Sequence, residues 1–197
     1  SLETIRAFDN HAQVANPVHS PNGEFLAVSI WEDGKRDLIV LNSDGSHYRR
    51  ITSDTAHDMD PAWSADGRWL YFSSDRSSIF NIYAVELETE AVYQVTNVLG
   101  GAFHPAPSPD GTRLAFESFS HNGMDVVWTP LARDQWKQSD TLVAPDGEGS
   151  LQATQSLSET EAPPPESAEP VPAGKPADST LLPSGIPEST PLLELPG

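Results

Sequence analysis

Short apolar runs separated by turn residues occupy the first two thirds of the chain. In the clearest stretch the runs are residues 61–64, 68–74, 79–86 and 92–96, and apolar side chains alternate in them with polar ones. Between the runs lie "ADG", "DRSS" and "LETE", which are rich in turn-forming residues. No helical spacing persists. Alternation with a period of two, interrupted every few residues by turns, predicts short antiparallel β-strands.

This pattern occurs three times with a fixed period. Proline stands at 17, 61 and 105, and glycine at 23, 67 and 111, so both series advance by 44 residues. Four short antiparallel strands in about 40 to 45 residues are typical of one propeller blade. The predicted fold class is therefore all-β: a partial β-propeller of about three four-stranded antiparallel blades with a disordered Pro-rich C-terminal tail. The blades are expected at about 15–56, 59–100 and 103–144, the third with a weak fourth strand, for which 134–145 is the only candidate.

The N-terminal residues fit the same frame. Residues 5–8 ("IRAF") precede 49–52 ("RRIT") by 44. They therefore occupy the position of a fourth strand in the repeat, but no first three strands precede them. Residues 1–144 are thus predicted to be an incomplete propeller that opens with the last strand of a preceding blade. Because known propellers close with about four to eight blades, three blades leave two open faces. We expect another chain or domain to complete the ring.

Residues 145–197 differ from the rest in composition. They hold no aromatic residue, eleven of the eighteen prolines, nine acids and a single base, Lys175. Such a segment cannot bury enough apolar surface to offset its chain entropy, so we predict an acidic, disordered linker or tail. Its clusters Leu181-Leu182 and Leu192-Leu193 could dock on a partner as an extended peptide, and an inert spacer is the alternative.

The acidic balance excludes one class of partner. The formal net charge is −18, of which −10 falls on residues 1–144. An acidic surface repels phosphate backbones, so we expect no nucleic-acid partner. No apolar run approaches the roughly 20 residues that span a bilayer, and the start "SLETIRAFDN" lacks the pattern of a signal peptide. The absence of Cys removes disulfides, thiolate ligands and cysteine nucleophiles from consideration.

The repeats resemble a known family. "DPAWSADGRWLYFSSDR" (60–76), "YAVELETEAVYQVTN" (83–97) and "HPAPSPDGTRLAFES" (104–118) are similar to the TolB-type, WD40-like propeller repeat, and the resemblance covers about residues 3–135. It departs from the family pattern at Asn22, where Asp is usual, and at Ala65, where Pro is usual. The resemblance implies a propeller of the bacterial envelope, often periplasmic, that acts as an interaction platform. Similar blades occur in tricorn-like and prolyl-oligopeptidase-like peptidases.

A candidate site follows from the blade pattern. The residue before each inner-strand proline is Asn16, Asp60 or His104, and two positions after the proline stand His19 and Trp63 in the first two copies. Since the first strand of every blade lines the central channel of a propeller, these five residues are predicted to gather at one channel mouth and to bind a ligand or partner. The alternative is that they only hydrogen-bond neighbouring loops and water.

No pattern assigns catalysis. The chain has no Gly-x-Ser-x-Gly elbow, and no pair of carboxylates is singled out for glycoside hydrolysis. The loop at 53–58 ("SDTAHD") is expected to be a solvated connection rather than a metal site, and Ser74-Asp75-Arg76 to tie a strand to a loop by a charged hydrogen bond. We predict no catalytic residue, no metal and no cofactor.

The sequence thus favours a non-enzymatic protein-interaction or scaffold module of the bacterial cell envelope, in the periplasm, with protein partners. Two alternatives stay open. The chain could be the propeller of a larger hydrolase or peptidase whose catalytic domain lies outside it, or a propeller that binds a small ligand or metal through Asn16, Asp60 and His104.

Overall fold

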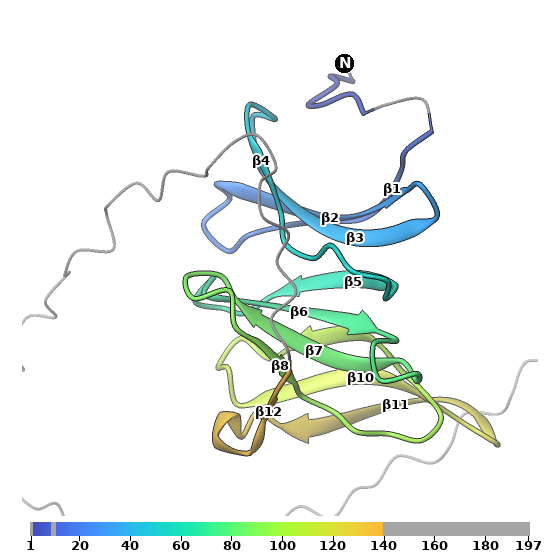
Figure 1. Ribbon diagram of the computed structural model, residues 1–197. Coiled ribbons are helices and arrows are strands. Elements are labelled where there is room, and N and C mark those ends of the chain that lie inside the picture. The colour runs from blue at the N-terminus through green and yellow to red at the C-terminus, as the bar shows by residue number, and fades with distance from the viewer. Residues whose placement is uncertain (1, 9–10, 140–197) are drawn as a thin grey trace, which may run out of the picture. The chain divides into compact units, whose positions relative to one another are not determined.

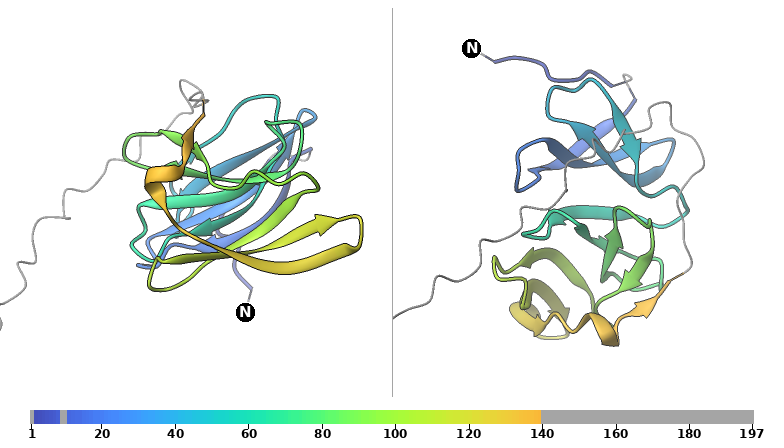
Figure 2. Two further views of the ribbon diagram at one scale, coloured as in Figure 1. Left: turned by 90° about the horizontal axis from the view of Figure 1, so that it is seen from below. Right: turned by 90° about the vertical axis from the view of Figure 1, so that its left-hand side faces the viewer.

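Three antiparallel sheets follow one another along the chain in the computed structural model, which describes residues 2–8 and 11–139. They are stacked in chain order in Figures 1 and 2. The first sheet has the strand order β1 (Gln13–His19), β2 (Phe25–Glu32), β3 (Lys35–Asn42) and β4 (Tyr48–Arg50). The second contains β5 (Asp58–Trp63), β6 (Trp69–Ser74), β7 (Asn81–Glu86) and β8 (Val92–Gln94). The third contains β9 (Ala102–Pro107), β10 (Arg113–Ser120) and β11 (Gly123–Pro130).

The all-β propeller class predicted from the sequence is confirmed. The third sheet nevertheless has three strands in the part of the chain that the structure describes. After a 3-10 turn (Arg133–Gln135), the two-residue strand β12 (Lys137–Gln138) pairs with β8 of the second sheet. The segment expected to supply a fourth strand to the third sheet thus extends the second. The predicted tail, 145–197, lies outside the described residues.

One turn recurs between the first two strands of every sheet. Gly23, Gly67 and Gly111 adopt φ values of 74°, 70° and 68°, the left-handed region that glycine enters without steric cost. In the third sheet the Gly111 amide donates to the Ser108 carbonyl, and the Asp110 carboxylate accepts from the Thr112 amide. The turn segment "ADG" and the glycines of the 44-residue period therefore lie where the first two strands of a sheet are joined.

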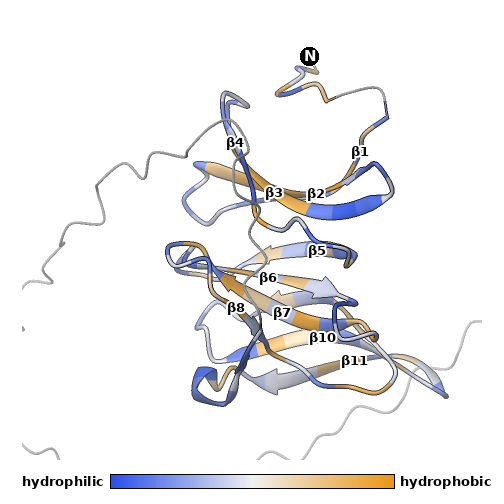
Figure 3. Cartoon of the chain, in the orientation of Figure 1, coloured by the Kyte–Doolittle hydropathy of each residue, from blue (hydrophilic) through white to orange (hydrophobic). Residues whose placement is uncertain are grey.

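Side chains of alternating strand positions fill the space between sheets. Ala27, Leu38 and Val40 of the first sheet pack against residues of the second such as Phe72 and Tyr83. The other face of the second sheet packs in the same way against the third. Figure 3 shows how the pattern is set within one strand: β3 begins hydrophilic and becomes hydrophobic where it enters this core. The second sheet is therefore covered on both faces.

The N-terminal segment lies against the first sheet. Phe8 packs on the apolar face that points away from the second sheet. The Arg6 guanidinium donates to the Gly45 carbonyl of the first sheet at 3.0 Å. In the same way, Arg49 of β4 donates to the Leu87 carbonyl of the second sheet at 3.2 Å. Residues 2–8 form no strand, but they touch the outer turn of the first sheet as β4 touches that of the second. Their assignment to a preceding blade stays a prediction.

Among the described residues there is no helix with the length and apolarity needed to cross a membrane.

Candidate functional site

The innermost strand of every sheet carries a bulge at the same place. Asn16-Pro17 of β1, Asp60-Pro61 of β5 and His104-Pro105 of β9 each stand opposite a single residue of the neighbouring strand. Proline fits here because it has no amide hydrogen to contribute to the ladder. A bulge turns the strand and re-aims its side chains, so three equivalent residues are turned in the same way.

These bulges share an uncommon backbone conformation. Asn16, Asp60 and His104 have φ values of 55°, 55° and 51°. Residues other than glycine rarely adopt positive φ, and Asn, Asp and His are the types that do so most readily. The residue before a proline is restricted as well. The positive φ therefore explains why these positions hold Asn, Asp and His. Their side chains remain available for other contacts.

The three bulges converge on one hollow of about 210 Å³. Its lining consists of Asn16, Pro17, Val18, Asp60, Pro61, His104 and Pro105, so each of the three sheets contributes. Bulges and left-handed backbone concentrate at functional sites because strain of this kind persists only where the surrounding structure enforces it. This hollow is the candidate site.

A chain of polar side-chain contacts crosses the site. His104 Nε2 lies 3.5 Å from Asp60 Oδ1, and His104 Nδ1 lies 3.2 Å from Glu117 Oε2. The Ser73 hydroxyl donates to Asp60 Oδ2 at 3.1 Å. Asp60 is buried, at 7% exposure, whereas the His104 side chain is 56% exposed. The site thus has a fixed carboxylate at its base and an accessible imidazole at its rim.

The structure brings together three of the five predicted site residues. Asn16, Asp60 and His104 line the hollow, and its lining includes neither His19 nor Trp63. Trp63 is 8% exposed within the core between the first two sheets, and its indole Nε1 donates to the Val18 carbonyl at 3.0 Å. His19 is exposed at the end of β1.

Glu117 is the site residue that the sequence analysis missed. It lies in β10, 13 residues after His104, and its carboxylate contacts the His104 ring. The equivalent positions of the other two copies are Ser29 and Ser73, whose hydroxyls contact Asn16 and Asp60. Ser29, Ser73 and Glu117 are spaced by 44 residues, so the period could have identified them as the residues that contact each bulge.

The arrangement suits recognition of a hydrogen-bond donor or cation. Two carboxylates, Asp60 and Glu117, flank one imidazole, and the Asn16 side chain adds an amide. Within residues 2–8 and 11–139 no group of three or more His, Cys, Asp or Glu side chains is arranged to hold a metal ion. We find no nucleophile paired with a base in the hollow's lining.

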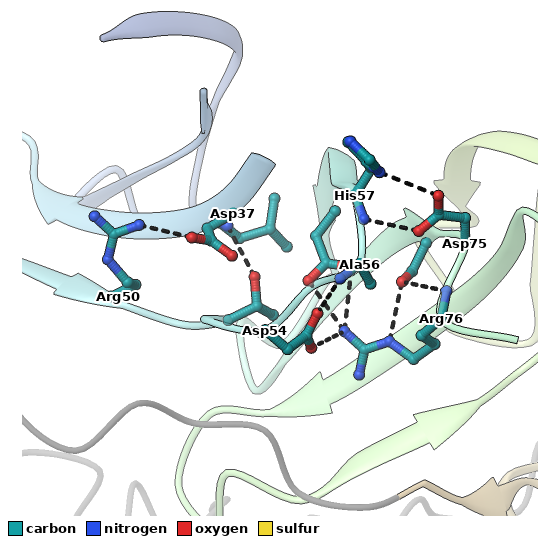
Figure 4. Close-up of polar contacts among 11 residues, drawn as sticks. Asp37, Arg50, Asp54, Ala56, His57, Asp75 and Arg76 are labelled. Carbon is teal, nitrogen blue, oxygen red and sulfur yellow. Dashed lines mark hydrogen bonds and ion pairs between the residues drawn. The ribbon is translucent and has the colours of Figure 1, made fainter. Parts of the chain in front are cut away.

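A second polar cluster joins the first two sheets (Figure 4). Arg76 Nη2 lies 3.0 Å from Asp58 and 3.4 Å from Asp54, and Arg76 Nε donates to the Ser74 hydroxyl. The Arg76 and Asp58 side chains are 6% and 0% exposed. The predicted tie through residues 74–76 is confirmed. The expectation of a solvated loop at 53–58 is wrong for its two acids, Asp54 and Asp58, whose side chains are 11% and 0% exposed and pair with Arg76.

Burial dominates the electrostatics of this cluster. It raises the pKa of Asp58, against the opposing effect of Arg76. It also raises the pKa of Asp37 to about 6, although Arg50 Nη1 lies 2.9 Å from that carboxylate. His57 and Asp75 complete the cluster at its edge, with 3.1 Å between Nδ1 and Oδ2 (Figure 4). Every one of these groups has a partner within the protein, so the cluster is part of the interface between the sheets and is not a second candidate site.

Comparison with known proteins agrees with the repeats. A family model described as the TolB beta propeller domain matches residues 2–149. An uncharacterized protein of Agrobacterium fabrum is 29% identical over 106 residues, which are 54% of this chain and 36% of that protein. The Tol-Pal system protein TolB of Francisella tularensis is 32% identical over 80 residues, which are 40% of this chain and 18% of that protein.

Solved structures show the same fold. TolB from Acinetobacter baumannii superimposes with a TM-score of 0.58 at 18% identity, over 69% of this chain and 34% of that one. Oligogalacturonate lyase in complex with manganese gives a TM-score of 0.51 at 17% identity, over 67% of this chain and 39% of that one. The chain spans less than two fifths of the length of each of these relatives.

Proposed function

The chain belongs to the TolB β-propeller domain family, and from this membership we propose that it is a non-enzymatic protein-interaction module of a bacterial envelope assembly, located in the periplasm. Relatives that share part of the chain carry the name Tol-Pal system protein TolB. An assembly of that kind is the setting we propose. Recognition suits this fold because rigid sheets hold side chains of different repeats at fixed spacing.

The observation that carries the proposal is the convergence of three equivalent left-handed residues, Asn16, Asp60 and His104, on one open hollow. The hollow draws on all three sheets and exposes an imidazole above a buried carboxylate. An extended segment of a partner that carries a Lys or Arg side chain complements Asp60 and Glu117. The net charge of −18 would steer such a cationic segment toward the protein.

Site-specific photocrosslinking tests this proposal. A photoreactive residue is placed at Pro17, which lines the hollow in β1, or at Glu117, which contacts His104 from β10. Neither position has the positive φ of the bulge residues, and exposed Glu88 and Lys35 are the controls. The proteins are exposed to periplasmic extract, and crosslinked partners are identified by mass spectrometry. One partner captured from both hollow positions and from neither control is expected. Capture from all four positions equally would contradict a site at the hollow.

The captured partner is then titrated against the parent chain and His104→Gly. Glycine keeps the positive φ of this position while removing the imidazole. We expect binding at least about tenfold weaker, or about 1.4 kcal/mol, with affinity that falls as salt rises. Unchanged affinity in both His104→Gly and a Glu117→Gln variant would remove the hollow from the proposal.

A further inference from the structure

The His104 ring presents both of its nitrogens to carboxylates. Nε2 lies 3.5 Å from Asp60 Oδ1, and Nδ1 lies 3.2 Å from Glu117 Oε2. A neutral imidazole donates a hydrogen bond from one nitrogen and accepts one at the other, whereas the protonated ring donates from both. The two carboxylates therefore match the protonated ring on both sides. The neutral ring has one nitrogen left that can accept a hydrogen bond from a ligand.

Asp60 has one oxygen left for a ligand, and the ring faces it. Asp60 Oδ2 accepts from the Ser73 hydroxyl at 3.1 Å and from the His104 amide at 3.4 Å. Oδ1 is the oxygen that lies next to the His104 ring. Because Asp60 is 7% exposed and lines the hollow, a ligand reaches Oδ1 from the hollow, beside the ring. A ligand cation and the protonated ring thus compete for the same oxygen.

The charge of the site depends on the same ring. With Asp60 and Glu117 ionised, the neutral ring leaves both negative charges to a ligand, and the protonated ring offsets one of them. The other charged side chains on the strands packed against β9 have partners elsewhere: Asp58 pairs with Arg76, Glu86 with Arg68, and Arg113 contacts the Trp128 ring. Among the described residues in contact with this ring, Asp60 and Glu117 are the charged ones.

The remainder of the lining favours a cation on an aliphatic stem. Pro17, Pro61 and Pro105 come from one sheet each and line the hollow together with Val18. Lys and Arg bury their methylene groups along apolar surface while the charged head stays with polar groups. An apolar lining beside two carboxylates suits such a side chain better than an inorganic ion, which has no apolar part.

We propose that protonation of His104 switches the hollow between two states. The neutral ring joins Asp60 and Glu117 in accepting hydrogen bonds from a partner's Lys or Arg side chain, and the protonated ring takes the place of that cation. This inference rests on the proposed function and adds the regulation of its site. Histidine is the side chain whose charge ordinarily changes between pH 5 and 8. Binding therefore releases a proton and becomes tighter as pH rises.

An NMR titration with a blocked peptide, Ala-Ala-Lys-Ala-Ala, tests the switch at pH 5.5 and pH 7.5. The backbone amide signals of Asp60, His104 and Glu117 report binding in the hollow, and the same peptide with Gln in place of Lys is the uncharged control. A proton that competes fully at an ordinary imidazole weakens binding about tenfold between these pH values, and we expect this loss for the Lys peptide. With the peptide at saturation, the His104 ring signals are expected to titrate at lower pH than in the free protein.

Two matched substitutions assign the effect to His104. His104→Asn removes the titrating group and supplies a residue type that tolerates the positive φ of this position, so equal affinity at the two pH values is expected. His121→Asn exchanges an exposed histidine in the turn between β10 and β11 and is expected to keep the pH dependence. Asp37, whose pKa burial raises to about 6, also titrates in this range. Since Asp37 is present in both variants, it cannot account for a difference between them.

The outcomes separate this inference from the site on which it rests. Equal affinity of the parent chain at both pH values, or a pH dependence that persists in His104→Asn, would overturn the proton switch and leave the cation site in place. No binding of the Lys peptide at either pH, or equal binding of the Gln peptide, would overturn the cation site and the switch together.

Discussion

Ile82 in the second sheet and Val126 in the third stand at the same position of the repeat, 44 residues apart, on the third strand of their sheets. Ile82 is 0% exposed and Val126 is 81% exposed. The side chains are similar in size and the strands pair in the same register. Ile82 faces a neighbouring sheet and Val126 faces none among the described residues, so the neighbouring sheet decides whether the side chain is buried. In a stack of repeats, the stability of each unit depends on the sheets beside it.

The largest effect on stability is expected from a substitution at the interface between the first and second sheets. Arg76→Met leaves Asp58, which is 0% exposed, and Asp54 without their cation. The cost in unfolding free energy is expected to be about 3 to 5 kcal/mol, measured by urea denaturation. Arg113→Met, which removes an exposed contact with the Trp128 ring at 4.5 Å, should cost less than about 1 kcal/mol.

Adding Asp58→Asn to Arg76→Met checks the cause. Without the buried carboxylate, part of the lost stability should return. A double variant less stable than Arg76→Met would mean that packing of the arginine over Phe72 and Tyr83, at 5.2 and 4.9 Å, matters more than its charge.

The next largest effect is expected from a pair of matched substitutions that test the comparison of Ile82 with Val126. Ile82→Ala should destabilise the protein by about 2 to 5 kcal/mol, because it opens a cavity between the second and third sheets. Val126→Ala should change stability by less than about 0.5 kcal/mol, because the Val126 side chain is 81% exposed. Equal costs would show that this face of the third sheet is covered in solution.

A smaller effect concerns pH at the covered interface. Burial raises the pKa of Asp37 to about 6 from 3.8. As pH falls, the folded state therefore binds a proton at this carboxylate near pH 6, before the unfolded state does, and the cost of burying the charge is removed. Relative to Asp37→Asn, the parent chain should gain about 1 kcal/mol of stability between pH 7 and pH 5. Parallel pH profiles of the two proteins would rule out this account.

The smallest effect has the opposite sign and lies in the third sheet. The Ser108 hydroxyl, with Thr112, lowers the pKa of Asp110 to about 2. Its stabilisation is present above the unfolded pKa near 4 and is lost as pH falls toward 2. In an NMR titration, Ser108→Ala should move the pKa of Asp110 back toward 4. Ser108→Thr keeps a hydroxyl and should leave it low.

The sequence predicted those parts of the fold that depend on local residue order. The 44-residue period located the sheets, and its glycines, Gly23, Gly67 and Gly111, stand in the turns between the first two strands, where the structure gives them positive φ. The period also predicted that Asn16, Asp60 and His104 lie together, because residues at the same position of successive repeats lie side by side when the repeats are stacked.

What escaped prediction depends on contacts between distant residues. Asp58 is buried because Arg76, 18 residues later, neutralises it, and Trp63 is buried because its indole finds the Val18 carbonyl 45 residues away. Residues 137 and 138 have the phase of a fourth strand in the third sheet but pair with β8, where Trp136 packs on Trp69. No local pattern encodes these choices.

The left-handed bulges limit how this surface can vary. Where φ is near +50°, β-branched and bulky residues are strongly disfavoured, so substitution at positions 16, 60 and 104 is confined to Asn, Asp, His and Gly. Of these four residue types, Asn is neutral, Asp is negatively charged, His can take up a proton, and Gly has no side chain. Substitutions at these three positions can thus change the binding preference of the hollow without changing the backbone that holds them.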